Sequence, residues 1–218
     1  MTADETLEGF HHRFEPGIEG SSTPTLLLLH GTGGDEHDLL GLGRTLSRDA
    51  HLLSPRGQVL ERGQPRFFRR FAAGVFDVED LRERAHTLAA FVAAGVARYG
   101  FDPGRVTGVG FSNGANIAAG LLLLHPETLA GAILLRPSLP FEPAAPSRLD
   151  GVPVLICAGH ADTVTSPGSA ERLAQVLGES GADVTLRWDA GGHAIGLAEV
   201  EAARDWFAAR RIPATRPS

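Results

Sequence analysis

The stretch Val106-Thr-Gly-Val-Gly-Phe-Ser-Asn-Gly-Ala-Asn116 decides the fold, because its periodicity changes at a single serine. Residues 106–111 are a short apolar run of the kind found in strands buried on both faces. A helix is predicted to follow from residue 113 to residue 125. Gly110-Phe111-Ser112-Asn113-Gly114 therefore places the pattern G-x-S-x-G between a strand and a helix. That context predicts a nucleophile elbow, a turn so tight that both flanks need glycine and the Ser112 hydroxyl is exposed.

Two periodicities alternate along the rest of the chain. Short apolar runs that end at Gly, Pro or Ser predict further strands over residues 25–30, 50–54, 131–135 and 152–158. A sixth predicted strand, residues 183–189, alternates apolar with polar side chains and is expected near a sheet edge. Helical patterns cover residues 81–99, a segment that begins at Ser166-Pro167, and residues 197–209. Strands alternating with helices predict an α/β fold with a mostly parallel sheet and helices on both faces.

Composition excludes several classes of function. The chain has 218 residues and a formal net charge of -6, and all 20 of its cationic side chains are arginine. The absence of lysine excludes a lysine Schiff base, a lysine general base and a P-loop lysine. The acidic balance offers no basic stripe for a phosphate backbone, so nucleic acid is not an expected partner.

Length and cysteine usage predict one cytoplasmic domain. Cys157 is the only cysteine, so an internal disulfide and a thiolate metal cluster are both excluded, and we expect it to be ordinary strand packing. The amino terminus is acidic, and the longest apolar run, residues 88–97, is too short to span a bilayer. We therefore expect a single domain over residues 1–218, with a core at about 10–209, short flexible tails and no integral membrane association. A homodimer is left open.

A catalytic serine needs a base to remove its proton and a carboxylate to orient that base. His193 follows Gly191-Gly192 in the loop after the last predicted strand, and Asp162 lies in Gly159-His160-Ala161-Asp162 after another. The order Ser112, Asp162, His193 is the order found in α/β-hydrolases. Asp189 remains an alternative acid, whereas His160 lies too close in sequence to Asp162 to face it and is interpreted as shaping its loop.

The segment His30-Gly31-Thr32-Gly33-Gly34 supplies the third requirement, donors for an oxyanion. A turn of this kind after a buried strand directs the backbone N–H of Thr32 into a cleft, where the N–H of Asn113 is its expected partner. The alternative is a phosphate-binding glycine loop. A dinucleotide fingerprint needs a third glycine where the sequence has Glu36, so this alternative does not fit.

Together these residues resemble a known family. His30-Gly31-Thr32-Gly33-Gly34-Asp35-Glu36, Ser54-Pro55-Arg56-Gly57, the elbow at Ser112, the Asp162 loop and Gly191-Gly192-His193 look like the landmarks of the small phospholipase/carboxylesterase family of α/β-hydrolases. That family includes acyl-protein thioesterase-like enzymes, and the match spans roughly residues 10–209. The resemblance implies an α/β-hydrolase fold with a minimal cap and a serine esterase that needs no metal or cofactor. It also supports Thr32 and Asn113 as oxyanion donors and Asp162 as the acid.

We accordingly expect hydrolysis of a small or medium carboxylic ester through an acyl-enzyme. The alternatives are a thioesterase or lysophospholipase that uses the same three residues, and a non-catalytic binding protein on the same fold. Two irregular stretches are candidates for the substrate pocket. Residues 65–77 are interpreted as a flap over the cleft, and residues 137–151 follow a strand. The expected pocket residues are Phe67, Phe68, Phe71, Leu139 and Phe141, although core packing is an equally open role for them.

Overall fold

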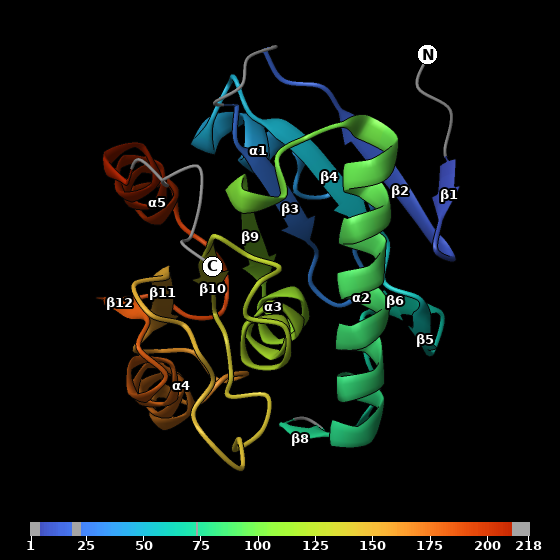
Figure 1. The fold of residues 1–218 in the computed structure, drawn as a ribbon. Helices are drawn as coiled ribbons and strands as arrows, with labels where there is room; N and C mark the ends of the chain where they lie inside the picture. The colour runs from blue at the N-terminus through green and yellow to red at the C-terminus, as the bar shows by residue number, and fades with distance from the viewer. Residues whose placement is uncertain (1–4, 19–22, 73, 211–218) are drawn as a thin grey trace.

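A computed structural model describes residues 5–18, 23–72 and 74–210 of the chain (Figure 1). Eight strands form one sheet in the order β1-β2-β4-β3-β9-β10-β11-β12. Their bounds are β1 Glu5–Leu7, β2 Phe10–Glu15, β3 Thr25–Leu29, β4 His51–Pro55, β9 Val106–Phe111, β10 Gly131–Leu135, β11 Pro153–Gly159 and β12 Asp183–Asp189. The six strands from β4 to β12 run parallel, whereas β2 pairs antiparallel with both β4 and β1. The predicted mostly parallel sheet is therefore confirmed.

The predicted strands agree with the observed ones to within a residue or two, and β12 lies at the sheet edge as its alternation indicated. The antiparallel strands β1 and β2 were not predicted. Residues Phe10 and His12 are buried and Phe14 is half-buried, so a period of two was present in this segment. The two histidines and Arg13 interrupt its apolar character, which hid the pattern.

Helices cover both faces of the sheet (Figure 1). They are α1 Leu40–Leu46, α2 Val78–Tyr99, α3 Asn113–Leu124, α4 Pro167–Glu179 and α5 Leu197–Ala209, with a 3-10 turn η1 at Pro103–Arg105. Leu27 and Leu29 of β3 face the core beneath α2, α3 and α4, whereas Leu26 and Leu28 face the core beneath α1 and α5. A strand that alternates between two cores must be apolar at every position, which explains the continuous leucine run.

The helix starts follow capping chemistry. Ser166 accepts a hydrogen bond from the Ser169 N–H and precedes Pro167 at the first helical position, as the sequence predicts. Asp77 caps α2 through the Asp80 N–H, and Gly100 ends that helix at φ 73. In helix α5 the buried residue of the first turn is the charged Glu199, and Val200 is only half-buried.

The part of the chain between β4 and α2, which includes the segment 65–77 interpreted as a flap, contains two small hairpins. Strands β5 Val59–Glu61 and β6 Gln64–Arg66 form one, and β7 Arg70–Ala72 and β8 Val75–Phe76 form the other. Among the described residues between β4 and α2, these two hairpins are the regular structure that lies outside the main sheet. The expected tail at residues 212–218 lies outside the described residues.

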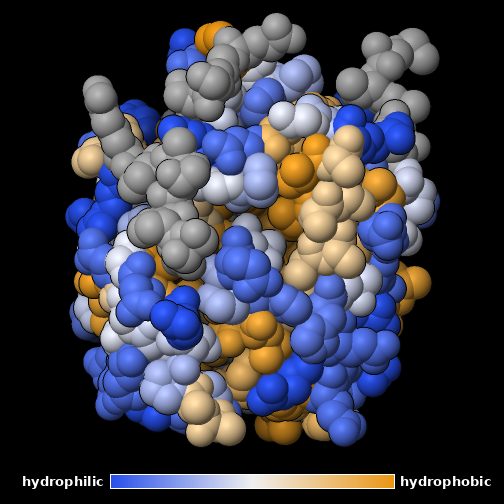
Figure 2. Space-filling model, viewed as in Figure 1, coloured by the Kyte–Doolittle hydropathy of each residue, from blue (hydrophilic) through white to orange (hydrophobic). Residues whose placement is uncertain are grey.

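The surface in Figure 2, seen from the same side as Figure 1, mixes hydrophilic and hydrophobic residues. A weakly hydrophobic band lies over the upper, carboxyl-terminal part of α2, where Ala90, Ala93 and Ala97 are exposed. Alanine side chains are too small to make this band a large apolar surface. No helix among the described residues combines the length and the apolar character that crossing a bilayer requires.

Candidate active site

Ser112 stands between β9 and α3 in a backbone conformation that L residues rarely adopt. Its φ is 50° and its ψ is -111°, and its N–H donates to the Leu135 carbonyl at 2.9 Å. A Cβ on Gly114 would overlap the Leu29 carbonyl, and one on Gly110 would lie 2.5 Å from the Gly114 oxygen. The two glycines of the motif therefore allow α3 to begin directly against β3 and β9, and this close packing holds Ser112 in its strained turn.

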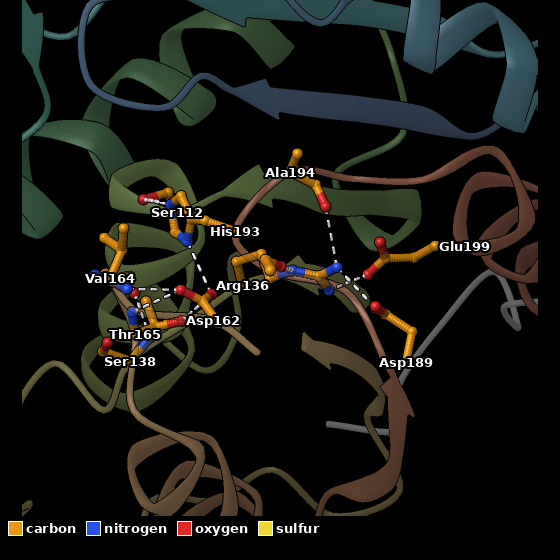
Figure 3. Close-up of polar contacts among 12 residues, drawn as sticks. Ser112, Arg136, Ser138, Asp162, Val164, Thr165, Asp189, His193, Ala194 and Glu199 are labelled. Atoms are coloured by element: carbon orange, nitrogen blue, oxygen red, sulfur yellow. Dashed lines mark hydrogen bonds and ion pairs between the residues drawn. The ribbon is translucent and has the colours of Figure 1, made fainter. Parts of the chain in front are cut away.

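The three residues predicted to form a triad lie in one chain of hydrogen bonds (Figure 3). His193 comes from the loop between β12 and α5, and its Nε2 lies 2.9 Å from Ser112 Oγ. Its Nδ1 lies 2.8 Å from Asp162 Oδ2, in the loop that follows β11. Because β9, β11 and β12 run parallel, their carboxyl ends meet at one edge of the sheet, which brings the three side chains together.

The Asp162 carboxylate accepts four hydrogen bonds and its side chain is only 1% exposed. Oδ1 accepts from the N–H groups of Val164 at 2.7 Å and Thr165 at 3.0 Å, and Oδ2 accepts from Thr165 Oγ1 at 2.5 Å and from His193. Burial acts to raise the pKa of Asp162, but the hydrogen bonds from Thr165, His193 and Val164 outweigh it and lower that pKa to about 2. The group is therefore an anion at neutral pH.

The carboxylate of the alternative acid, Asp189, is hydrogen-bonded to groups other than His193. Its Oδ2 accepts from Arg136 Nη2 at 2.7 Å and its Oδ1 accepts from the Gly191 N–H at 2.5 Å. His160 stacks on Trp188 at 4.8 Å between ring centroids. Among the described residues, Asp162 and not Asp189 or His160 is hydrogen-bonded to the His193 imidazole, so the geometry favours Asp162 over Asp189 as the partner of His193.

The loop after β3 is held by its own histidine. His30 is buried, its Nε2 accepts from the Gly57 N–H at 2.9 Å, and its Nδ1 lies 2.6 Å from the Gly31 carbonyl. A nitrogen that accepts from a backbone N–H carries no proton, so Nδ1 carries it and donates to Gly31. Burial lowers the pKa of His30, which keeps the ring neutral in this role.

A short segment, Pro65-Arg66-Phe67, is hydrogen-bonded to the loop of Thr32 and to Asn113, the two predicted oxyanion residues. The Gly33 N–H donates to the Pro65 carbonyl at 2.9 Å, and Arg66 Nη1 donates to Thr32 Oγ1 at 2.7 Å. The Phe67 N–H donates to Asn113 Oδ1 at 2.8 Å. Strand β6 and the residue after it therefore connect the loop of Thr32 to the first turn of α3. The sequence gives no signal for this connection, because its acceptors come from segments far apart in the chain.

The five predicted pocket residues have different environments. Phe67 packs on His30 and Phe68 on Phe76, and both phenylalanines are buried. Phe71 is 76% exposed on β7. Leu139 is half-buried, and the buried Phe141 ring lies under the Arg82 guanidinium, 4.2 Å from its centroid. Part of the 65–77 segment is thus built into the core, and Phe71 is the one aromatic ring of the three that is free to contact a ligand.

One buried charged cluster was not expected. Arg136, directly after β10, is 1% exposed and lies between the two acidic residues Asp189 and Glu199 (Figure 3). An arginine that ends an apolar strand resembles a surface residue in sequence. The only available signal was its place at the carboxyl end of a parallel strand, where functional groups gather. The nearby Cys157 thiol has its pKa raised to about 12 by burial, so it is a poor nucleophile.

The chain is similar to known proteins over most of its length. The sequence model of the Phospholipase/Carboxylesterase family matches residues 18–210. A putative hydrolase, MhqD of Bacillus subtilis, is 47% identical over 189 residues, which are 87% of this chain and 94% of that protein. A Bacillus cereus carboxylesterase structure is 43% identical with a TM-score of 0.89, covering 92% of this chain and 94% of that one. A carboxylesterase from Mesorhizobium loti is 33% identical with a TM-score of 0.82, covering 88% and 91%.

Proposed function

Because this chain belongs to the phospholipase/carboxylesterase family of hydrolases, we propose that it hydrolyses a small or medium carboxylic ester through an acyl-enzyme on Ser112. The observation that carries the proposal is the unbroken hydrogen-bond path from Ser112 Oγ through the His193 ring to Asp162. A hydroxyl with a base on one side and a buried anion behind that base can lose its proton as it attacks.

In the first half of the reaction Ser112 Oγ attacks the ester carbonyl while His193 Nε2 takes the hydroxyl proton. The Asp162 carboxylate stabilises the resulting imidazolium through Nδ1. His193 then gives the proton to the departing alkoxide, the carbon–oxygen bond to that alkoxide breaks, and the acyl group stays on Ser112. In the second half, His193 removes a proton from water, the hydroxide attacks the acyl carbon, and Ser112 recovers its proton as the acid leaves.

The backbone N–H groups of Thr32 and Asn113 are proposed to bind the oxyanion of both tetrahedral intermediates. Asn113 is the first residue of α3, whose first N–H groups have no partner within the helix. The helix dipole adds a partial positive charge at the same end. The bonds from Arg66 to Thr32 and from Phe67 to Asn113 support this role, since they hold both residues before substrate arrives.

The proposed substrate is uncharged near the reacting bond. Arg69 and Arg70, the cations closest in sequence to Phe71, are paired with Asp77 and with Glu61. Both guanidinium groups already have a carboxylate partner, which supports an apolar acyl or alcohol group beside Phe71 over an acidic one. We further propose that the chain is a single cytoplasmic domain that works without a metal or cofactor.

The test is an ester series with p-nitrophenol as the leaving group and acyl chains of increasing length, measured beside the matching thioesters. For esters whose deacylation is slower than their acylation, the acyl-enzyme accumulates, so a burst of p-nitrophenol equal to the enzyme concentration is expected before the steady state. A fluorophosphonate should label Ser112 and no other residue. Hydrolysis of thioesters but not esters would favour the thioesterase alternative, and labelling at another serine would refute the assignment. Absence of both hydrolysis and labelling would favour a binding protein.

A further inference from the structure

Arg136 carries a guanidinium that is fully enclosed by its partners. Its backbone is left-handed, with φ 55°, and its N–H donates to the Cys157 carbonyl at 2.8 Å. The guanidinium nitrogens donate to two carboxylates and two backbone carbonyls. The distances are 2.5 Å from Nη1 to Glu199 Oε1, 2.7 Å from Nη2 to Asp189 Oδ2, 2.8 Å from Nε to the Gly192 oxygen and 3.1 Å from Nη2 to the Ala194 oxygen.

The two carbonyls belong to the residues on either side of His193 (Figure 3). This loop joins β12 to α5, has no regular secondary structure and contains two consecutive glycines. A glycine pair gives a backbone many accessible conformations. The imidazole can lie 2.9 Å from Ser112 Oγ in a defined orientation only if the backbone on both sides of His193 is fixed, and Arg136 contacts both sides.

The two carboxylates that neutralise Arg136 also bind the ends of the same loop. Asp189 Oδ1 accepts from the Gly191 N–H, and Glu199 Oε2 lies 3.4 Å from the Gly196 N–H. The side chains of Arg136, Asp189 and Glu199 therefore contact the backbone of the loop at four positions, Gly191, Gly192, Ala194 and Gly196. A planar guanidinium can direct N–H groups to four acceptors at once, whereas a lysine ammonium has three donors on a single nitrogen.

We propose that Arg136 is a positioning residue that sets the place of the His193 imidazole by fixing the Gly192 and Ala194 carbonyls. The inference rests on the proposed role of His193 as the base. Arg136 touches neither Ser112 nor Asp162 through any bond in the described residues, so its effect passes through the backbone of the loop. Loss of the guanidinium should lower kcat and leave KM unchanged, because only the geometry of proton transfer is altered.

The chain offers a matched control. Arg44 of α1 also donates to a carboxylate, Glu15 at 2.9 Å, and to a backbone carbonyl, Ala50 at 2.9 Å. This second cluster lies beside the start of β4, at the amino ends of the parallel strands and away from Ser112. A substitution at Arg44 removes a similar set of charged hydrogen bonds without reaching the His193 loop.

The experiment compares Arg136→Lys, Arg136→Ala and Arg44→Ala with the unchanged protein. For each we would measure kcat, KM, the rate of fluorophosphonate labelling and the folded fraction by circular dichroism. Arg136→Lys retains a positive charge for Asp189 and Glu199, so it keeps the test available if Arg136→Ala does not fold. We expect kcat per folded molecule to fall on the order of 10²-fold in both Arg136 variants, with KM within about twofold. Arg44→Ala should keep kcat per folded molecule while its melting temperature falls.

Two further measurements separate positioning from general stability. Backbone amides at residues 191–196 should exchange faster in Arg136→Lys than in the unchanged protein, with no such change in Arg44→Ala. A cavity of about 230 Å³ is lined by Asp189 and Glu199 and opens to solvent. Methylguanidinium added to folded Arg136→Ala should therefore restore part of kcat with saturation, and equal concentrations of urea should not.

Wild-type kcat per folded molecule in Arg136→Lys, or equal losses in the Arg136 and Arg44 variants, would overturn the inference. Those results differ from failure of the proposed function itself. If the unchanged protein neither hydrolyses esters nor reacts at Ser112, the role of His193 fails. Amide exchange at residues 191–196 would still report whether Arg136 fixes this loop. Unchanged exchange in Arg136→Lys would show that the bonds from the Arg136 guanidinium do not hold the loop in place.

Discussion

Replacing Asp162 with asparagine tests the proposed base most directly, because the structure predicts which way the new amide must turn. The Oδ1 side of the carboxylate faces the N–H groups of Val164 and Thr165, which can only donate. The amide oxygen of the variant must occupy that side, so its NH₂ faces Thr165 Oγ1 and His193 Nδ1. The Thr165 hydroxyl can rotate and accept a hydrogen bond from this NH₂ group. The His193 imidazole can accept one at Nδ1 only if the proton on Nδ1 moves to Nε2.

A proton on Nε2 removes the lone pair that would accept the Ser112 proton. The wrong tautomer should therefore lower kcat on the order of 10⁴-fold while the backbone stays in place. The pKa of Asp162 is lowered from 3.8 to about 2 in the folded protein. That shift corresponds to about 2 kcal/mol of folding free energy at neutral pH, a contribution that the Asp162→Asn variant lacks.

The sign of the pH dependence follows from the lowered pKa. The unfolded chain binds a proton at Asp162 before the folded chain does, so this contribution is complete above about pH 5 and is lost as the pH falls toward 2. Roughly 1 kcal/mol should be gone by pH 3. Urea unfolding of both proteins from pH 7 to pH 3 should show the difference in unfolding free energy between them shrinking by that amount.

Two variants control this experiment. Asp189→Asn keeps an acceptor for Arg136 and should cost far less kcat than Asp162→Asn. Asp102→Asn removes a carboxylate that caps the turn η1, which lies at the amino end of β9, opposite the end where Ser112 stands, and should leave kcat unchanged. The reasoning is refuted if Asp162→Asn retains kcat within about tenfold of the unchanged protein. A larger loss in Asp189→Asn than in Asp162→Asn would exchange the two roles.

Three further outcomes follow from the elbow and from the segment at 65–77. Ser112→Ala should abolish burst kinetics and labelling, and Ser112→Gly should be more stable than Ser112→Ala by roughly 1 kcal/mol in urea, because glycine relieves the positive φ. Gly114→Ala should cost more than about 3 kcal/mol or prevent folding, since its Cβ would overlap the Leu29 carbonyl; a normal melting temperature would contradict the packing described. Phe68→Ala should lose about 3–5 kcal/mol and affect all esters alike, whereas Phe71→Ala should leave stability nearly unchanged and alter kcat/KM between aliphatic and aromatic esters by about tenfold. Equal selectivity in both variants would remove Phe71 from the substrate contacts.

The parallel sheet and the three candidate catalytic residues could be predicted because each has a local signal. Leu26 to Leu29 are apolar at every position, as a strand between two cores must be. Ser112 and Asp162 follow buried strands of this kind, and His193 follows the alternating edge strand β12. Parallel strands bring their carboxyl ends to one edge, so residues far apart in sequence could be placed near each other without knowing the strand order.

Other features depend on contacts between distant segments and left no local pattern. Phe68 and Phe71 belong to one aromatic and basic run, yet the first is buried and the second is exposed, because the hairpin geometry decides which ring faces inward. Arg136 and Glu199 are 63 positions apart, and each alone resembles a solvated side chain. Only the pairing of their opposite charges makes their burial favourable.

The attachment of Pro65-Arg66-Phe67 to Thr32 and Asn113 has a consequence for how the protein responds to heat. This segment belongs to a hairpin of two three-residue strands outside the main sheet. Small units of this kind open by local fluctuation at a lower free energy than the sheet beneath them. Each opening would release both proposed oxyanion donors and expose Phe67 while the strands of the main sheet stayed paired. Catalysis would then cease reversibly at temperatures below the melting of the sheet, so the temperature limit of the enzyme would be set by the few hydrogen bonds of this segment.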